Sequence, residues 1–534
     1  MNVTFIFPDW VDPEATIEHD KQGHGIGHLS FAVATLSAVL KQSGHDVNLL
    51  HICYTPKETS FKDMLREQCG KTDLFAFSFT EVEKFWVRDM ARWIHEETGR
   101  PCIGGGIYPT LEPEKTLRML GLDMACIGEG EDAMLEVCAR MEQGRDAEGV
   151  ENIWFLRGEE LVKNPTGRFV EDLDTLPPFD YDLFDPSRLK IFVSNLPRLY
   201  YLCTRNCVFG CAFCANHAKR QAMKCGSKYV RRFSPERVIS DLKLYLSKFP
   251  QVRLIHFADE VIHQDKEWFG RLMKLYREEI ALPWRSYAMV KVLDEEVIGI
   301  MARSHCARVN LGIEAGSARV RKLYNRPEVT EEEIIGKIKL LKRHGIDVHT
   351  STLLNAPTET LDEMIETIKL VARADTDIAV TGIVVPYDGT RLRRMAEEMD
   401  LYDELAVENT GVSIRPVDCT PNKVLFLYHA YRLLVEVYKY LYKRPGLSRF
   451  LMPAVDAVVK SPLLPHTLLI AIRKRFFEGR ILNWAYRKAE TRLGREERNL
   501  KTAINEVVDL DHQVALPPGR EQVVRRMGHA ADPR

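Results

Sequence analysis

The chain has 534 residues, of which 45% are hydrophobic and 28% are charged, and its formal net charge is -2. This length exceeds what one hydrophobic core supports, so we expect about three domains. The balanced charge argues against a general nucleic-acid-binding protein, which is usually basic. No apolar run is long enough for a transmembrane helix. The cysteines follow no pairing pattern and no signal peptide is evident, which predicts a cytoplasmic protein.

Short apolar runs alternate with helical stretches over residues 1 to about 145. This alternation predicts a parallel, doubly wound sheet, whose ligands bind at the carboxyl ends of the strands. Turns of small and polar residues follow three of the predicted strands, at Ser78 to Thr80, Gly104 to Thr110 and Gly128 to Glu131. The predicted strands are Val3 to Phe7, Val47 to Leu50, Leu74 to Phe79, Pro101 to Ile103 and Met124 to Ile127.

Residues 146 to 190 are expected to connect this domain to the next. They contain one short predicted strand, Asn152 to Phe155, and then the pair Pro177 and Pro178. Successive prolines exclude helix and favour a stiff, extended path.

Three cysteines, Cys207, Cys211 and Cys214, lie within eight residues, just after a predicted strand that ends near Leu202. Cysteine thiolates are the ligands of iron-sulfur clusters, and three of them leave one iron of a cubane open to a small molecule. A structural zinc site usually takes two separated pairs of ligands instead. The alternative is a closed zinc site completed by Cys203.

The span from residue 191 to about 405 predicts about six further βα units. Asp259 and Glu260 follow the predicted strand Val252 to Phe257, and carboxylates at that end of a barrel strand lie on its active face. The alternative is that both acids cap a helix. The other predicted strands include Ser286 to Val290, Arg308 to Leu311, Val348 to Leu354 and Ile378 to Val385.

The pattern C-x3-C-x-aromatic-C, with Phe213 as the aromatic, resembles the signature of the radical S-adenosylmethionine (SAM) superfamily. The resemblance implies a partial (β/α)6 TIM-type barrel and a [4Fe-4S] cluster on Cys207, Cys211 and Cys214. SAM would chelate the open iron, Phe213 would contact its adenine, and cleavage would give a 5'-deoxyadenosyl radical. Asp259 and Glu260 would be catalytic residues near SAM or substrate.

Gly312 to Gly316, read as G-I-E-A-G, resembles the G-I-E-S-G signature of one class of these enzymes. The resemblance implies that Glu314 contacts the SAM ribose or amino group, with Gly312 and Ser286 as further cofactor-binding residues. Asn355 to Thr360 departs from the usual G-L-P-G-E-T because both glycines are replaced.

The turns of the first domain resemble the cobalamin (B12)-binding domain that precedes the barrel in that class. Gln22 to Gly27 looks like a degraded D-x-H-x-x-G, which makes His24 a candidate lower ligand of cobalt; otherwise His24 is an ordinary loop residue. The alternative for the whole domain is a Rossmann-like domain that binds another nucleotide or none. The implied cobalamin-binding residues are His24, Gly27, Ser78, Thr80, Gly104, Gly105, Gly106, Glu129 and Gly130.

Residues 406 to 534 are predicted to be a helical domain that includes a helix from Lys423 to Arg444. Its later part combines many basic residues with aromatic ones. Such a surface could rest on an anionic membrane as a peripheral contact, or it could cover the mouth of the barrel.

Together these features predict an α/β protein with four segments. These are a cobalamin-binding domain (1–145), a linker (146–190), a radical SAM barrel (191–405) and a helical domain (406–534). The expected reaction is methylation of an unactivated carbon of a small-molecule substrate, such as a lipid or isoprenoid, with flavodoxin or ferredoxin as external electron donor. The alternatives are cyclisation or oxidative rearrangement, and a non-enzymatic ligand-binding protein with structural zinc. Modification of tRNA is disfavoured by the balanced charge.

Overall fold

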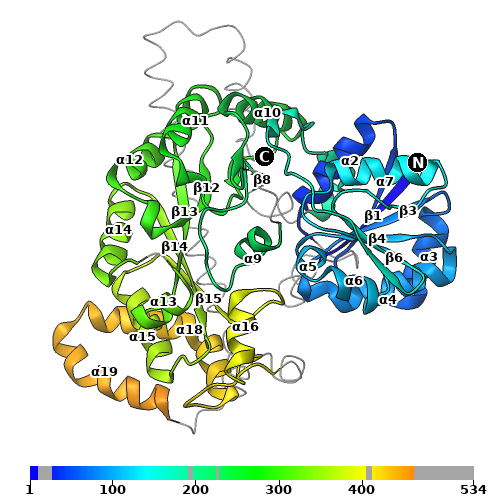
Figure 1. Ribbon diagram of the computed structural model, residues 1–534. Helices are drawn as coiled ribbons and strands as arrows, with labels where there is room; N and C mark the ends of the chain where they lie inside the picture. Colours follow the sequence, from blue (N-terminus) through cyan, green and yellow to red (C-terminus); the bar gives the residue numbers. More distant parts are fainter. Residues whose placement is uncertain (10–26, 190–196, 224–227, 327, 404–411, 462–534) are drawn as a thin grey trace, which may run out of the picture. The chain divides into compact units, whose positions relative to one another are not determined.

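The computed structural model describes residues 1–9, 27–189, 197–223, 228–326, 328–403 and 412–461 (Figure 1). The chain divides into two units, residues 1–466 and 467–534, and the second lies outside the described residues. His24 also lies outside them. The account below therefore concerns the first unit.

The first sheet has seven strands in the order β2-β1-β3-β4-β5-β6-β7. The first five strands of that order are parallel, as the βα alternation predicts, and β6 and β7 add an antiparallel hairpin at the edge next to β5. The segment that was expected to be a linker therefore contributes two strands to this sheet. The strands are β1 (Asn2–Pro8), β2 (Asp46–Ile52), β3 (Leu74–Ser78), β4 (Cys102–Gly105), β5 (Met124–Cys126), β6 (Ile153–Arg157) and β7 (Glu160–Lys163).

Helices pack on both faces of the first sheet because each has one apolar stripe (Figure 1). The core on one side joins Phe75 and Phe77 of β3 to Val87, Met90 and Ile94. The helices are α2 (Phe31–Gln42), α3 (Glu58–Gln68), α4 (Lys84–Thr98), α5 (Ile107–Leu111), α6 (Pro113–Arg118) and α7 (Glu131–Glu142).

The second sheet has six parallel strands in the order β8-β11-β12-β13-β14-β15, so each strand lies beside the next one in the sequence. This arrangement confirms the expected partial barrel. The strands are β8 (Arg198–Tyr201), β11 (Leu254–Phe257), β12 (Trp284–Met289), β13 (Cys306–Glu314), β14 (Asp347–Leu354) and β15 (Ile378–Ile383), and the short strands β9 (Thr204–Arg205) and β10 (Arg231–Arg232) pair separately.

Helices of the second sheet gather on one of its faces (Figure 1). Trp284 on β12 packs against Phe257 of β11 and Phe269 of α11, which identifies the helix-covered face. The helices of this region are α9 (Ala215–Ala222), α10 (Pro235–Lys248), α11 (Lys266–Glu279), α12 (Glu295–Arg303), α13 (Ala318–Leu323), α14 (Glu331–Arg343), α15 (Leu361–Arg373) and α16 (Arg391–Glu398).

Two further helices follow, α18 (Pro421–Tyr442) and α19 (Pro445–Lys460). The predicted helix Lys423 to Arg444 corresponds to α18, which packs on α15 and β15. Pro445, which the sequence indicates as a helix end, also begins α19, where proline is tolerated because the first turn needs no donor. Within the described ranges no helix is long and apolar enough to cross a membrane.

Candidate cofactor site

The three cysteines of the predicted cluster motif lie together in the loop that follows β8. Cys207 and Cys211 are buried in one apolar cluster with Val261 and Met289, and the half-buried Cys214 packs against it. Burial, with smaller contributions from the charges of Glu260, Cys214 and Cys211, raises the pKa of the Cys207 thiol to about 11. The loop thus presents three thiols to one shielded volume.

Cys203, the fourth cysteine of the zinc alternative, lies outside this apolar cluster. Its thiol is fully buried at the end of β8, where burial and the neighbouring charge of Asp259 raise its pKa well above the ordinary value. The thiol of Cys203 is therefore directed toward Asp259. Three thiols together and a fourth beside a carboxylate fit an open iron-sulfur cluster better than a closed zinc site.

Arg326 joins the cysteine loop to the predicted SAM-binding turn. Its Nη1 donates to the Cys211 Sγ at 3.4 Å, and its Nη2 donates to the Gly312 carbonyl at 2.6 Å. The Glu314 Oε1 lies 3.4 Å from the same Nη2. The structure therefore brings Cys211, Gly312 and Glu314 around one guanidinium, which can hydrogen-bond a cluster sulfur and fix the carboxylate.

The predicted SAM-binding turn has an unusual backbone. Glu314 has a left-handed φ of 67°, which non-glycine residues seldom adopt and which favours a functional role. Burial raises the pKa of Glu314 although Arg326 opposes this effect. A Cβ at Gly312 would lie 2.5 Å from the Glu314 Oε1, so a glycine at 312 leaves room for that carboxylate.

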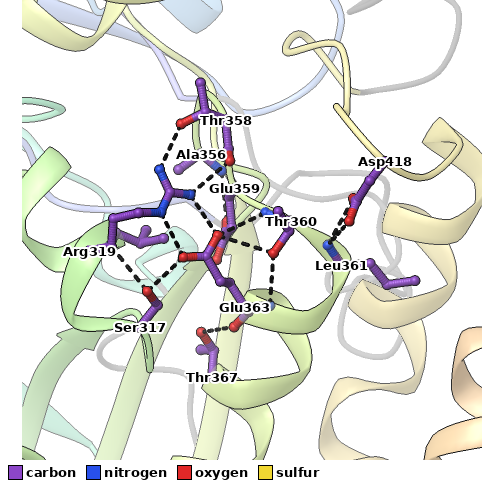
Figure 2. A network of polar contacts seen from close by, with 11 residues as sticks. Ser317, Arg319, Ala356, Thr358, Glu359, Thr360, Leu361, Glu363, Thr367 and Asp418 are labelled. Atoms are coloured by element: carbon purple, nitrogen blue, oxygen red, sulfur yellow. Dashed lines mark hydrogen bonds and ion pairs between the residues drawn. The ribbon is translucent and has the colours of Figure 1, made fainter.

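A polar network fastens this turn to the turn after β14 (Figure 2). Arg319 donates to both carboxylate oxygens of Glu363 at 2.8 and 2.6 Å, and it also donates to the Thr358 carbonyl at 2.8 Å. Ser317 donates to Glu363 at 2.8 Å, and Glu363 also accepts from the Thr360 N–H at 3.0 Å. The two turns at the carboxyl edge of the sheet are thus held by one carboxylate.

Asp259 holds the backbone at the start of the cysteine loop. Its carboxylate accepts from the backbone N–H of Cys203 at 3.2 Å and of Thr204 at 2.6 Å, and it is completely buried. Burial raises its pKa to about 7, against the lowering effect of these hydrogen bonds. Glu260 instead accepts from Asn216 Nδ2 at 2.8 Å, on the loop side.

Two other predicted residues of the barrel occupy different surroundings. Phe213 packs edge-on against Tyr324, with the ring centroids 5.2 Å apart, beside the three thiols. The hydroxyl of Ser286 is buried 3.5 Å from the His263 Nε2, and the ring of His263 stacks near Trp284 on the helix-covered face. The structure therefore does not bring the Ser286 side chain to Glu314.

The glycine turn of the first sheet is shaped by the chain's own packing. Ser78 at the end of β3 is in register with Gly105 on β4. Gly106 has φ 102°, and a Cβ there would lie 2.7 Å from the Phe79 carbonyl oxygen; at Gly104 it would lie 2.9 Å from Leu122. Glycine is thus required at 106, and it avoids a close contact at 104, whether or not a nucleotide tail approaches.

Thr80 and Gly130 begin helices. Thr80 donates to the Glu83 Oε2 at 2.7 Å, in a capping interaction ahead of α4. Gly130 is the N-cap of α7, so any contact that it makes with a cofactor uses the backbone. Both residues lie at the carboxyl edge of the first sheet, as the sequence indicates.

Glu129 takes part in a buried ion-pair cluster. Its two carboxylate oxygens accept from Arg231 on β10 at 2.8 and 2.7 Å, and Arg205 on β9 lies 3.2 Å away. Arg205 also donates to Glu131 at 2.6 Å. Although burial opposes ionisation, these arginines lower the pKa of Glu129. Arg205 precedes Cys207 by two residues, so Glu129 braces the cysteine loop.

The sequence analysis missed a cluster at the carboxyl ends of β1 and β2. Asp9 Oδ1 lies 2.9 Å from His28 Nδ1, and Asp9 Oδ2 lies 2.9 Å from His51 Nε2. A Cβ on Gly27 would lie 2.4 Å from both Asp9 and His51, which explains the glycine at that position. The one signal was the position of Asp9 directly after a strand, because its partners lie far along the chain.

Comparisons with known proteins give two domain assignments. A model of the radical SAM superfamily matches residues 201–371, and a model of the B12 binding domain matches residues 27–138. The first match covers the cysteine loop and the strands β11 to β14. The second match ends before the hairpin of β6 and β7.

Curated relatives are similar at low identity. An uncharacterized methyltransferase of Pyrococcus horikoshii is 27% identical over 312 residues, which are 58% of this chain and 65% of that protein. The anaerobic magnesium-protoporphyrin IX monomethyl ester cyclase of Rubrivivax gelatinosus is 26% identical over 257 residues, 45% of this chain and 43% of that one. The chain thus spans less than two thirds of either relative.

Solved structures share the fold. The radical SAM methyltransferase TsrM of Kitasatospora setae, with cobalamin and a [4Fe-4S] cluster bound, superposes with a TM-score of 0.59 at 16% identity, covering 74% of this chain and 75% of that one. The cobalamin-dependent radical enzyme OxsB, with aqua-cobalamin and SAM bound, gives a TM-score of 0.59 at 16% identity, covering 98% and 83%.

Proposed function

The chain is a radical SAM protein in which a B12 binding domain precedes the radical SAM domain, and on that premise we propose that it methylates an unactivated carbon of a small molecule. The observation that carries this proposal is the grouping of Cys207, Cys211 and Cys214 in one shielded volume with Cys203 turned away. The domain order and the similarity to a methyltransferase support the choice of reaction.

The residues that would hold the cofactors follow from the site. Cys207, Cys211 and Cys214 would bind a [4Fe-4S] cluster, and Arg326 would donate to the Cys211 sulfur. Glu314 would accept from SAM hydroxyls or pair with its ammonium group. When bound, cluster and SAM supply a 5'-deoxyadenosyl radical, and cobalamin supplies a methyl group.

The chain's own contribution is to position and shield these groups. Asp259 holds the backbone at the start of the cysteine loop, and Phe213 with Tyr324 covers one side of the thiols. Glu260 is held by Asn216 beside the loop, where it can contact SAM or substrate. Exclusion of water protects a reactive radical from side reactions.

In the first domain, Ser78 and the glycine turn would flank the cobalamin tail. Ser78 is in register with Gly105 at the carboxyl edge, where doubly wound sheets bind ligands. Gly27, Thr80 and Gly130 would contribute from neighbouring loops. Glu129 would act indirectly, because its carboxylate is already paired with Arg231.

Reduction of the cluster requires an electron from outside, so we propose flavodoxin or ferredoxin as donor, and a cytoplasmic location suits it. The eleven cysteines of the described residues are free thiols, which fits a reducing compartment. A lipid or isoprenoid substrate, and peripheral membrane contact through the C-terminal region, remain predictions of the sequence.

The test is a comparison of two cysteine variants after anaerobic reconstitution with iron, sulfide and hydroxocobalamin. Cys211→Ala should lose most of the bound iron, because a cluster ligand is missing. Cys203→Ala is the matched control and should retain the wild-type iron content. Equal loss of iron in both variants, or zinc without iron in the wild type, would contradict the proposal.

The same preparation distinguishes methyl transfer from the alternative enzymatic reactions, cyclisation and oxidative rearrangement. About four irons and one cobalt per chain are expected. A product heavier by one methyl group supports methylation, whereas a product that has lost hydrogen without gaining carbon supports the cyclase reaction. Iron without cobalt would overturn methyl transfer through cobalamin.

A further inference from the structure

Three arginines lie together on the helix-free face of the second sheet. Arg198 begins β8, Arg285 is the second residue of β12, and Arg308 lies on β13 in register with Arg285. Side chains alternate along strands, and Trp284 occupies the helix-covered face, so Arg285 points to the other face. His256, which is in register with Arg285, stands on the same face and contacts it.

Aromatic and neutral groups surround these arginines. The Nη2 of Arg285 lies 2.9 Å from the Nδ1 of His256. The guanidinium of Arg198 lies over the ring of Tyr200, 5.8 Å from its centroid. The ring of His256 packs between Tyr200 and Tyr287, with centroids 4.4 and 5.3 Å away.

Two of the three arginines, Arg198 and Arg285, bring positive charge to this group that no described carboxylate pairs. Arg308 lies 3.3 Å from the carboxylate of Asp347. Within the described part of the chain, neither Arg198 nor Arg285 forms an ion pair with a carboxylate. Arg198 and Arg285 are half-buried, and a charge that is partly removed from water is normally paired with an opposite charge.

The pKa values of Arg285 and of two neighbouring histidines reflect this unpaired positive charge. Burial and the repulsion from Arg198 lower the pKa of Arg285 to about 10. Burial, together with repulsion from Arg285 and Arg198, lowers the pKa of His256 to about 2. Burial, together with repulsion from Arg308 and Arg285, lowers the pKa of His349 to about 3. Both histidines are therefore neutral, and neither offsets nor adds charge.

Several donors in this group have no acceptor. Among the described residues, the buried Nε atoms of Arg198 and Arg285 make no hydrogen bond, and the same is true of the Nε2 atoms of His256 and His349. Unsatisfied buried donors are uncommon in folded proteins and call for an explanation. An anion that accepts from these groups would satisfy the donors and neutralise the charge together.

The arginines lie on the same face of the strands as a residue that contacts the cysteine loop. Met289, which packs against the thiols of Cys207 and Cys211, follows Arg285 by four residues on the same face of β12. At about 3.3 Å per residue, the two levels are about 13 Å apart. Tyr287 and Asn310 lie between them, opposite each other in register.

We propose that Arg198, Arg285 and Arg308 bind an oxyanion of the substrate, a carboxylate or a phosphoryl group, at the amino-terminal end of the barrel. This inference rests on the proposed function, because it places the reacting carbon toward the thiols at the other end. The substrate is then an elongated anion rather than an uncharged lipid. Arg198, Arg285 and Arg308 are binding residues, and His256 positions Arg285.

The test is calorimetric titration of the full chain, with its cluster reconstituted, using methylphosphonate and phosphate in one arm and acetate and succinate in the other. The wild type should bind the anions of one arm, and that arm identifies the source of the charge. Arg285→Gln and Arg198→Gln should weaken binding at least tenfold. Arg271→Gln, an exposed arginine of α11 paired with Glu236, is the matched control and should bind as the wild type does.

A second measurement needs no ligand. Because Arg285 is repelled in the free protein, Arg285→Met should raise the melting temperature while abolishing anion binding. Arg285→Lys keeps the charge and should retain partial binding without the planar fork. Binding equal in wild type and Arg285→Gln, or a lowered melting temperature of Arg285→Met together with no anion binding by the wild type, would overturn the inference.

Iron content is measured for every variant, which separates this inference from the proposed function. Loss of anion binding at full iron content concerns the arginines alone and supports their role. A wild type without iron that still binds the anions would refute the proposed function and leave the oxyanion site intact.

Discussion

Glu359, in the turn after β14, is a buried carboxyl group whose ionisation is suppressed. Its Oε2 accepts from the Ala356 N–H at 2.8 Å, whereas its buried Oε1 has no hydrogen-bond partner among the residues that the structure describes. Burial raises its pKa to about 8; the Ala356 hydrogen bond and Arg319 lower it, and the charge of Glu363 raises it. The group is therefore protonated in the native state at neutral pH.

This shift predicts that stability falls as the pH rises from mildly acidic values to about 8. Between pH 4.5 and about 8 the unfolded chain releases the Glu359 proton while the native chain keeps it, so stability falls as pH rises through this window. The slope is at most about 1.4 kcal/mol per pH unit. Glu359→Gln cannot titrate and should flatten urea-unfolding free energies measured from pH 5 to 8.5. An unchanged slope would refute the shift.

At the scale of residues, the sequence predicts functions that depend on a short spacing along the chain. It does not reveal pairs of residues that lie far apart in the sequence. Cys207, Cys211 and Cys214 are recognisable because their ligand function depends on a short interval. Glu129 was expected to contact cobalamin, but its partner Arg231 lies 102 residues away, and no local pattern reveals such a pair. The roles of Asp259, Glu260 and Glu314 in catalysis or SAM binding remain predictions.

Helices α14 and α15 begin with the same capping box in different surroundings. Thr330 and Glu333 cap α14 at an exposed position, whereas Thr360 and Glu363 cap α15. Glu363 also accepts hydrogen bonds from Arg319 and Ser317 of the neighbouring turn, as Figure 2 shows. The second box therefore joins two turns, and the first serves one helix.

Removing each acid should distinguish the two boxes. Glu333→Ala should cost about 0.5–1 kcal/mol, the usual value of an exposed cap. Glu363→Ala should cost about 2–3 kcal/mol, because charge-assisted hydrogen bonds from Arg319 are lost as well. Chemical denaturation of both variants is the measurement. Equal costs would show that the contacts of Arg319 contribute nothing.

Elements with strong periodicity were predicted within a few residues, as α18 and the six strands of the second sheet demonstrate. The hairpin of β6 and β7 was harder, because a short strand does not reveal its partner. The arginines of the second sheet were overlooked for a related reason. Arg285 alternates with buried Trp284 and Ser286, and this period of two becomes informative only when the covered face is known.

At the scale of the whole molecule, the cluster of Glu129 with Arg205 and Arg231 links the first sheet to the strands beside the cysteine loop. Arg231 is 1% exposed, so its charge depends entirely on Glu129 for compensation within the described residues. A second contact joins Lys115 of α6 to Asp388, in the turn after β15, at 3.0 Å.

Breaking the first contact should uncouple the two sheets. Glu129→Gln leaves a buried guanidinium unpaired and should cost about 3–5 kcal/mol. Calorimetry should then show two unfolding transitions where the wild type shows one. Glu136→Gln, which removes an exposed pair with Arg140 on α7, is the control and should cost at most about 1 kcal/mol. A single transition in Glu129→Gln would contradict the coupling.

The hairpin of β6 and β7 also sets where this chain can be recombined with its relatives. A crossover at residue 145 would separate the hairpin, whose strand β6 pairs with β5, from the rest of its own sheet, and a poor match there would leave the edge of β5 unpaired. A crossover after Lys163 would carry the complete sheet. Chimeras that exchange N-terminal domains should therefore be joined beyond this hairpin, and natural gene fusions face the same constraint.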